Sequence, residues 1–117
     1  MQNTYFTSEE LELKNRAFLL GDAVKVSFFV RNSQLIMDEE CYFFLMASMR
    51  KMRMNIPLTY TLEFFQNLFK GKVIEENGVK NGIINFLVYR NSDGVTLSKS
   101  TISYFFEVNE MDDVLNV

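Results

Sequence analysis

The stretch Met37–Pro57, MDEECYFFLMASMRKMRMNIP, constrains the fold more than any other part of this chain. Asp38 is a favoured N-cap residue, acidic residues follow it, and basic residues close the stretch, so both ends complement a helix dipole. The charged residues are Glu39, Glu40, Arg50, Lys51 and Arg53. Pro57, the only proline, restricts the residue before it to extended dihedrals. The stretch therefore predicts a helix that begins after Asp38 and ends before Pro57.

One side of this predicted helix carries a continuous stripe at helical spacing, which we expect to face the core. The stripe consists of Cys41, Phe44, Leu45, Ser48, Met49 and Met52. Tyr42, Phe43 and Met46 are bulky and lie on other sides, so the helix is apolar all round for two turns. A chain of 117 residues has little else to cover those sides. We therefore predict that Tyr42, Phe43 and Met46 form an association surface.

The flanking segments predict an α+β domain over residues 1–117, a small antiparallel sheet with two helices packed on one face. Its order is β-β-α-α-β-β. The predicted elements are a strand over 24–31, a turn at Asn32-Ser33, a strand over 34–37, a helix capped by Thr59 or Thr61 and running to about Glu76, a central strand over 82–90 and a strand over 101–108. Tyr5–Phe6 is suited to close another short strand, and Gly71 weakens the second helix near its end. The tail 109–117 is expected to fray.

Composition removes several classes of function. The chain has no histidine and one cysteine, which excludes histidine-based acid–base catalysis, an internal disulfide framework and a thiolate zinc site within one chain. We therefore expect no metal. The net charge of −3 argues against nucleic acid and anionic membrane as partners. Met1 is not followed by a charged and then apolar leader, and we expect a cytoplasmic protein.

A few side chains have a reactive interpretation beside a structural one. Lys25 is either an amine with a perturbed pKa or, as we expect, an exposed side chain of a strand. Cys41 is either a reactive thiol near a helix N-terminus or, as we favour, a small buried core residue, because acidic neighbours oppose ionisation. Four acidic residues have two interpretations: a carboxylate cluster that binds a metal, or part of a solvated segment. They are Glu9, Glu10, Glu12 and Asp22.

The order of several short motifs resembles the N-terminal, smaller domain of class IV pyridoxal-phosphate enzymes. These enzymes include branched-chain and D-amino-acid aminotransferases and aminodeoxychorismate lyase. The resemblance runs from about Asn15 to Asp93 without an obvious gap. The motifs are Asn15-Arg16-Ala17-Phe18, Gly21-Asp22 opening a strand, Leu45-Met46-Ala47-Ser48-Met49-Arg50, Ile56-Pro57 and Val88-Tyr89-Arg90-Asn91. The resemblance implies the same α+β fold and a homodimer.

The departures from the family pattern fall on residues that carry its chemistry. Phe44 stands where the family has an arginine that binds the cofactor phosphate, and Cys41 stands where the family usually has histidine. Charge-assisted hydrogen bonds contribute about 1.5–3 kcal/mol each, so a phenyl ring is a poor substitute for that arginine. Ala23, Lys25, Val26 and Phe29 also depart from the family strand. Because Phe44 is assigned to the buried stripe, we expect Phe44→Arg to destabilise the fold.

In the family, the lysine that forms the internal aldimine lies in the C-terminal domain, which the resemblance places beyond Val117. None of the lysines of this chain occupies that position. They are Lys14, Lys25, Lys51, Lys70, Lys72, Lys80 and Lys99. We expect the chain alone to be catalytically inert, to bind no cofactor, and to act through a homodimer or a partner protein domain. The alternatives are one part of an active enzyme, which would bind pyridoxal phosphate once a second domain completes it, and a small-ligand binding module.

Overall fold

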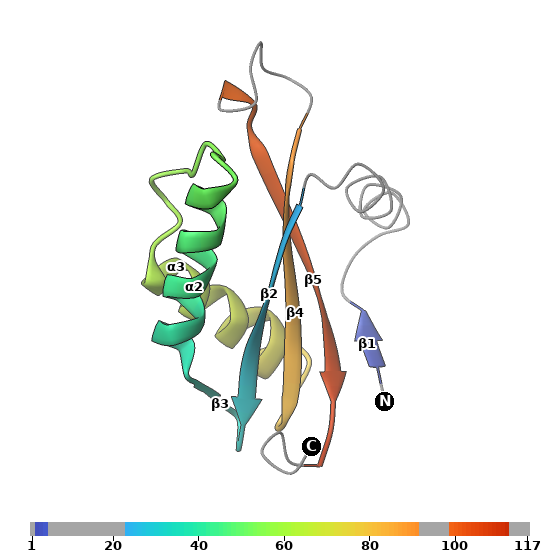
Figure 1. Ribbon diagram of the computed structural model, residues 1–117. Coiled ribbons are helices and arrows are strands. Elements are labelled where there is room, and N and C mark those ends of the chain that lie inside the picture. The colour runs from blue at the N-terminus through green and yellow to red at the C-terminus, as the bar shows by residue number, and fades with distance from the viewer. Residues whose placement is uncertain (1, 5–22, 92–98, 113–117) are drawn as a thin grey trace.

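The computed structural model describes residues 2–4, 23–91 and 99–112, which form an antiparallel sheet with helices on one face. Figure 1 shows helices α2 (Asp38–Lys51) and α3 (Leu62–Phe69) on the same side of the sheet. From the second strand onward the elements follow the predicted β-β-α-α-β-β order. The predicted α+β class is therefore confirmed.

The sheet has five strands in the order β1-β5-β4-β2-β3, and each neighbouring pair is antiparallel. The strands are β1 (Gln2–Thr4), β2 (Ala23–Arg31), β3 (Gln34–Ile36), β4 (Gly82–Arg90) and β5 (Ile102–Glu110). β4 is central, as its apolar residues on both faces predict, and its last five residues are all buried. β2 alternates between buried and more exposed positions, as predicted for a strand covered on one face.

The β1–β5 side of the sheet differs from expectation in two ways. β1 pairs with β5 and adds an edge strand close to the predicted strand end, while Tyr5 and Phe6 themselves lie outside the described residues. β5 runs on through Asn109 and Glu110, two residues of the tail that is predicted to fray, because both pair with the start of β4. Residues 113–117 of that tail lie outside the described residues.

The turn between β2 and β3 has the predicted two residues, both with left-handed dihedrals. Asn32 has φ 53° and Ser33 has φ 61°, as a hairpin of this length requires. Serine adopts this conformation poorly, and neighbouring backbone holds it: the Ser33 amide donates to the Lys80 carbonyl over 2.9 Å. The Asn32 amide donates to Asn81 Oδ1 over 3.1 Å. The loop before β4 therefore stabilises a turn that its own residues disfavour.

Both ends of α2 differ from the sequence prediction. Met37, not Asp38, is the N-cap residue, and no side chain caps this end. Asp38 instead lies in the first turn, where its Oδ2 accepts a hydrogen bond from Gln66 Nε2 over 2.6 Å. The helix ends at Lys51, well before Pro57, because Arg53 turns into a left-handed conformation with φ 55°. At the N-terminal end of α2, the contact of Asp38 with Gln66 outweighs the local preference of Asp38 for the N-cap position.

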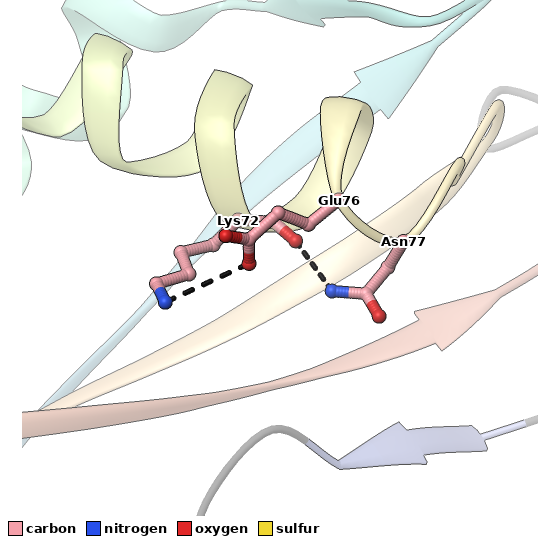
Figure 2. Close-up of polar contacts among 3 residues, drawn as sticks. All are labelled: Lys72, Glu76 and Asn77. Carbon is pink, nitrogen blue, oxygen red and sulfur yellow. Dashed lines mark hydrogen bonds and ion pairs between the residues drawn. The ribbon is translucent and has the colours of Figure 1, made fainter.

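Thr61, one of the two predicted cap residues, begins α3: its Oγ1 accepts from the Phe64 amide over 3.1 Å. The helix then widens into the π-helical turn η1 (Lys70–Glu75), which contains Gly71 and confirms that its last turns are irregular. Figure 2 shows how η1 ends: Asn77 Nδ2 donates to the Lys72 carbonyl over 2.5 Å, and Lys72 Nζ lies 3.6 Å from Glu76 Oε2. Gly78 follows with φ 63°, a conformation that favours glycine.

Aromatic rings fill the space between α3 and the sheet. Phe28 of β2 and Phe86 of β4 meet Phe65 and Phe69 of α3, and all four side chains are fully buried. Ring centroids lie 4.8 Å apart for Phe28–Phe69 and 5.3 Å apart for Phe65–Phe86, within the range of favourable aromatic pairs. The core therefore lies on the helix-covered face, and α2 packs beside it against β2.

Candidate functional site

α2 has one face in the core and one face exposed, and the division is not the predicted one. Its buried residues are Cys41, Leu45, Met46 and Met49. Met46 is only 6% exposed, so it cannot contribute to an exposed association surface as predicted. Phe44, predicted to be buried, is 63% exposed. The helix is rotated relative to the predicted stripe, because the sheet and α3 contact the side centred on Leu45 and Met49.

The exposed residues of α2 form a continuous arc, which we call the outer face. They are Glu39, Glu40, Phe43, Phe44, Ala47, Arg50 and Lys51. Their spacing of three, four and seven residues places them along one side of a helix. The outer face therefore has an acidic end, two adjacent phenylalanines with an alanine in the middle, and a basic end.

The two phenylalanines are large apolar groups left in solvent. Phe43 is 60% exposed, and its ring lies against Tyr42 with centroids 5.5 Å apart. Tyr42 is half-buried and fixed, because its hydroxyl donates to the Tyr60 carbonyl over 3.0 Å and its ring packs on Phe65. Of the predicted surface residues, Phe43 is thus exposed, Tyr42 lies at the border of the outer face, and Met46 lies in the core.

The position of α2 is held at its C-terminal end by β4. Arg90, the last residue of β4, is 8% exposed, and its Nη2 donates to the Met52 carbonyl over 2.5 Å. Met52 is the C-cap residue of α2, so the guanidinium binds a carbonyl at the negative end of the helix dipole. Arg90 therefore orients α2, and with it the outer face, relative to the sheet.

Cys41 is a core residue, as favoured from the sequence. Burial raises the pKa of its thiol, and the carboxylates of Glu40 and Asp38 raise the pKa further. The thiol therefore stays protonated at neutral pH, which removes its interpretation as a nucleophile. Lys25 is exposed on the sheet face away from α2, as expected.

Metal binding finds no support in the described part of the chain, where no group of three or more histidine, cysteine or acidic side chains converges. The proposed cluster of Glu9, Glu10, Glu12 and Asp22 lies outside the described residues. Within the described ranges, no helix is long and apolar enough to cross a bilayer.

A cavity of about 440 Å³ lies between the β2–β3 hairpin, the start of α2 and η1. Its lining residues are Ser33, Gln34, Leu35, Asp38, Lys70, Ile74 and Glu75. Its volume suits a small ligand, and most of the surface that lines it is apolar, as in ligand pockets, although three of the lining residues, Asp38, Lys70 and Glu75, are charged. Asp38 is already hydrogen-bonded to Gln66. In size and lining, the cavity is compatible with the small-ligand alternative.

The sequence contained a signal that separates the outer face from the core. All four charged residues after Asp38 in α2 lie on the same arc as Phe44, which is four residues from Glu40 and seven from Lys51. Met46 is four residues from Tyr42 and three from Met49, on the uncharged side. Placing the charges first, and the apolar residues second, would have assigned Phe44 to the exposed side.

Comparisons with known proteins identify the fold. No family model and no curated protein sequence matches the chain. Among solved structures, a Legionella pneumophila protein assigned as a 4-amino-4-deoxychorismate lyase superposes with a TM-score of 0.66 and 15% identity, over 81% of this chain and 35% of that one. An Escherichia coli branched-chain amino acid aminotransferase gives 0.64 and 15%, over 81% and 33%.

A third match is the branched-chain amino acid aminotransferase of T.th. with pyridoxamine 5'-phosphate, with a TM-score of 0.64 and 16% identity. It covers 81% of this chain and 32% of the other, so the chain spans about a third of the length of the structures that it matches. The expected resemblance is confirmed at the level of fold. This chain has the fold of one part of the class IV aminotransferases and aminodeoxychorismate lyase.

Proposed function

We propose that this chain is a protein-association domain that has no catalytic activity by itself, and that the outer face of α2 is its contact surface. The single observation that carries the proposal is the exposure of Phe43 and Phe44, both at least 60% accessible, on a helix that is otherwise well packed. Exposed aromatic residues that lie together are typical of interaction sites.

The chemistry at the same helix supports a role without cofactor. Phe44 stands at the position that the resemblance gives to the phosphate-binding arginine, and a phenyl ring cannot neutralise a phosphate dianion. Cys41, at the family's histidine position, is buried and protonated. The cations of α2, Arg50 and Lys51, lie in its last turn, the end of a helix that disfavours anions. Together with the single cysteine, these features favour a cytoplasmic association domain.

A second candidate is one part of an active class IV pyridoxal-phosphate enzyme. It is favoured by the fact that the chain spans about a third of the matching structures, one of which contains pyridoxamine 5'-phosphate. In that case the outer face would pack on a lysine-bearing domain, and pyridoxal phosphate would bind only to the completed protein. Sequencing the native gene beyond the codon for Val117 separates the two candidates. A downstream domain with a Schiff-base lysine would favour the second.

Site-specific photo-crosslinking tests the association proposal. Phe44 is replaced by benzoylphenylalanine, and the chain is irradiated in its native cells. The matched control carries the same group at Lys72, whose side chain is 58% exposed and which belongs to η1, not to the outer face of α2. We expect one defined adduct from position 44 and none from position 72. The absence of an adduct at position 44, with the chain folded, would contradict the proposal.

A further inference from the structure

The open edge of β2 indicates what kind of partner the association domain binds. We propose that an extended segment of another protein adds to the sheet as a strand beside β2, where it pairs with Ala23, Lys25 and Ser27. The inference rests on the proposed association function and names the form of the partner. Phe44 of the outer face lies on the side of α2 next to this edge and contacts the added strand.

β3 covers only one end of this edge. It pairs with residues 29–31 of β2 and ends at Ile36, because Met37 takes a left-handed conformation with φ 54° and leads into α2. β2 has 9 residues, and among the described strands none pairs with residues 23–28 on the β3 side (Figure 1). An uncovered edge of this kind is a template for pairing with an extended segment of another chain.

The register of the hairpin shows which backbone groups of β2 point outward. Arg31 and Gln34 flank the two-residue turn, so they form a hydrogen-bonded pair, and such pairs alternate along the strand. Odd-numbered residues of β2 therefore direct their N–H and C=O groups to the β3 side, and even-numbered residues direct theirs to β4. Ala23, Lys25 and Ser27 thus present these groups along the open edge, and within the described part of the chain no hydrogen bond occupies them.

The arrangement of the helices places Phe44 beside the same edge. α3 extends over β4, since the rings of Phe69 and Phe86 lie with centroids 5.7 Å apart, whereas α2 packs against β2. Tyr42 lies on the α3 side of α2, with its ring centroid 5.9 Å from that of Phe65. Phe44 is two residues further along the helix and lies on the nearly opposite side, toward the edge of the sheet. Side chains of an added strand that point to the helix layer therefore meet Phe44.

Lys25 selects the chemistry of the added strand. Its side chain is exposed on the sheet face away from the helices. An acidic residue opposite Lys25 forms a cross-strand ion pair, and its two neighbours point to the helix layer and are apolar. A second copy that paired its own β2 through the same three residues would place Lys25 opposite Lys25, and like charges directly opposite each other are unfavourable. The edge thus fits a different protein whose segment alternates acidic and apolar residues.

Amide hydrogen exchange, measured by NMR on the purified full chain, tests whether the edge is open. We expect the amides of Lys25 and Ser27 to exchange at least about 100-fold faster than those of Val24 and Val26, whose N–H groups point to β4. Comparable protection of all four amides would mean that this edge is already covered, and would overturn the proposal.

Two substitutions at position 25 test strand addition in native cells, in the chain that carries benzoylphenylalanine at position 44. Lys25→Pro removes the outward N–H and places a ring in the path of an added strand, and an edge strand tolerates proline at such a position. Lys25→Ala is the matched control, because it removes the charge and keeps the N–H. We expect Lys25→Pro to lower the yield of adduct at least about tenfold, and Lys25→Ala less than about fivefold. Circular dichroism of the purified variants confirms that each one folds.

The outcomes separate this inference from the proposed function. An adduct with a different protein that Lys25→Ala retains and Lys25→Pro loses supports strand addition. Equal effects of the two substitutions, whether both retain or both lose the adduct, overturn strand addition and leave association through the outer face in place. An adduct with the mass of two copies of this chain also overturns the inference, because the partner is then a second copy. No adduct from position 44 in the folded chain contradicts both proposals.

Discussion

Phe44 and Met46 have exchanged roles relative to the sequence prediction, and this exchange has measurable consequences. Phe44 is 63% exposed and Met46 is 6% exposed, although both are bulky apolar residues two positions apart. The expectation that Phe44→Arg would destabilise the fold is therefore wrong in its premise, since an exposed position accepts a guanidinium without burying its charge.

Truncating each of the two side chains tests their environments. We expect Phe44→Ala to change the free energy of unfolding by less than about 0.5 kcal/mol, as is usual for an exposed position. Met46→Ala should lower it by about 2–5 kcal/mol, because it leaves a cavity in the core. Urea unfolding at about 0.5 µM protein, where self-association contributes little, measures both. Equal effects of the two substitutions would contradict the orientation of α2.

Tyr60 makes the stability of the fold sensitive to alkaline pH. Burial, with smaller contributions from Tyr104 and Tyr89, raises the pKa of its phenol from 10 to about 12. The unfolded chain therefore loses this proton first as pH rises, and the free energy of unfolding decreases between about pH 10 and 12. A shift of this size corresponds to about 2–3 kcal/mol.

The substitution Tyr60→Phe isolates this contribution. Below pH 10 the phenol is protonated in both folded and unfolded states, so it contributes no pH dependence there. Between pH 10 and 12, we expect the free energy of unfolding to fall less steeply with pH in the variant than in wild type. The reason is that the variant lacks the phenol proton that unfolded wild type releases in this range. Urea unfolding at closely spaced pH values measures the difference. Identical slopes would show that Tyr60 titrates normally in the folded chain.

Among the elements, α3 has an N-cap for which the sequence offers two candidates, Thr59 and Thr61. Thr61 Oγ1 accepts a hydrogen bond from the Phe64 amide, whereas Thr59 is exposed and lies before the helix. We expect Thr61→Ala to lower the free energy of unfolding by about 1 kcal/mol, because an amide of the first turn loses its acceptor. Thr59→Ala is the matched control, expected within about 0.5 kcal/mol of wild type. The reverse order would place the cap at Thr59.

The N-terminal ends of α2 and α3 differ because of a contact between the two helices. α3 begins where its own sequence favours a cap, while α2 begins at Met37 in a left-handed conformation, although Asp38 follows directly. The Asp38 carboxylate binds Gln66 of α3 instead. A contact between two helices thus overrides a local preference, and only the packed structure contains that contact.

For the whole molecule, the fold of a cofactor enzyme does not imply its chemistry. We expect the folded chain mixed with pyridoxal phosphate to show no more protein-aldimine absorbance than the same chain unfolded. The reason is that Phe44 replaces the phosphate-binding arginine and that none of the seven lysines stands at the Schiff-base position of the resemblance. A band that sodium borohydride abolishes and that only the folded chain shows would contradict this expectation.

Exposed lysines form imines with pyridoxal phosphate at random, so the measurement needs a matched control. The chain unfolded in urea has the same lysines without the fold. We expect the folded and unfolded chains to react to the same small extent. A band present in the folded chain alone would show that the fold builds a cofactor site, and would favour an active enzyme over an association domain.

The sequence by itself determined the kinds of elements and their order. The alternation of β2, the two-sided apolar character of β4 and the cap and glycine signals of α3 and η1 are local patterns, and each has few structural solutions. The α+β class, the strand at the centre of the sheet and the position of the first hairpin turn follow from them. The order of motifs also identified the fold that the solved structures confirm.

Only the tertiary structure decided which side of α2 is buried. Cys41 to Ala47 is apolar without interruption, so hydrophobic periodicity alone allows several rotations of the helix about its axis. The rotation is set by the sheet, by α3 and by the contact of Arg90 with the Met52 carbonyl, all of which join residues far apart in the chain. That rotation exposes Phe43 and Phe44 between two charged ends, and thereby creates the candidate site.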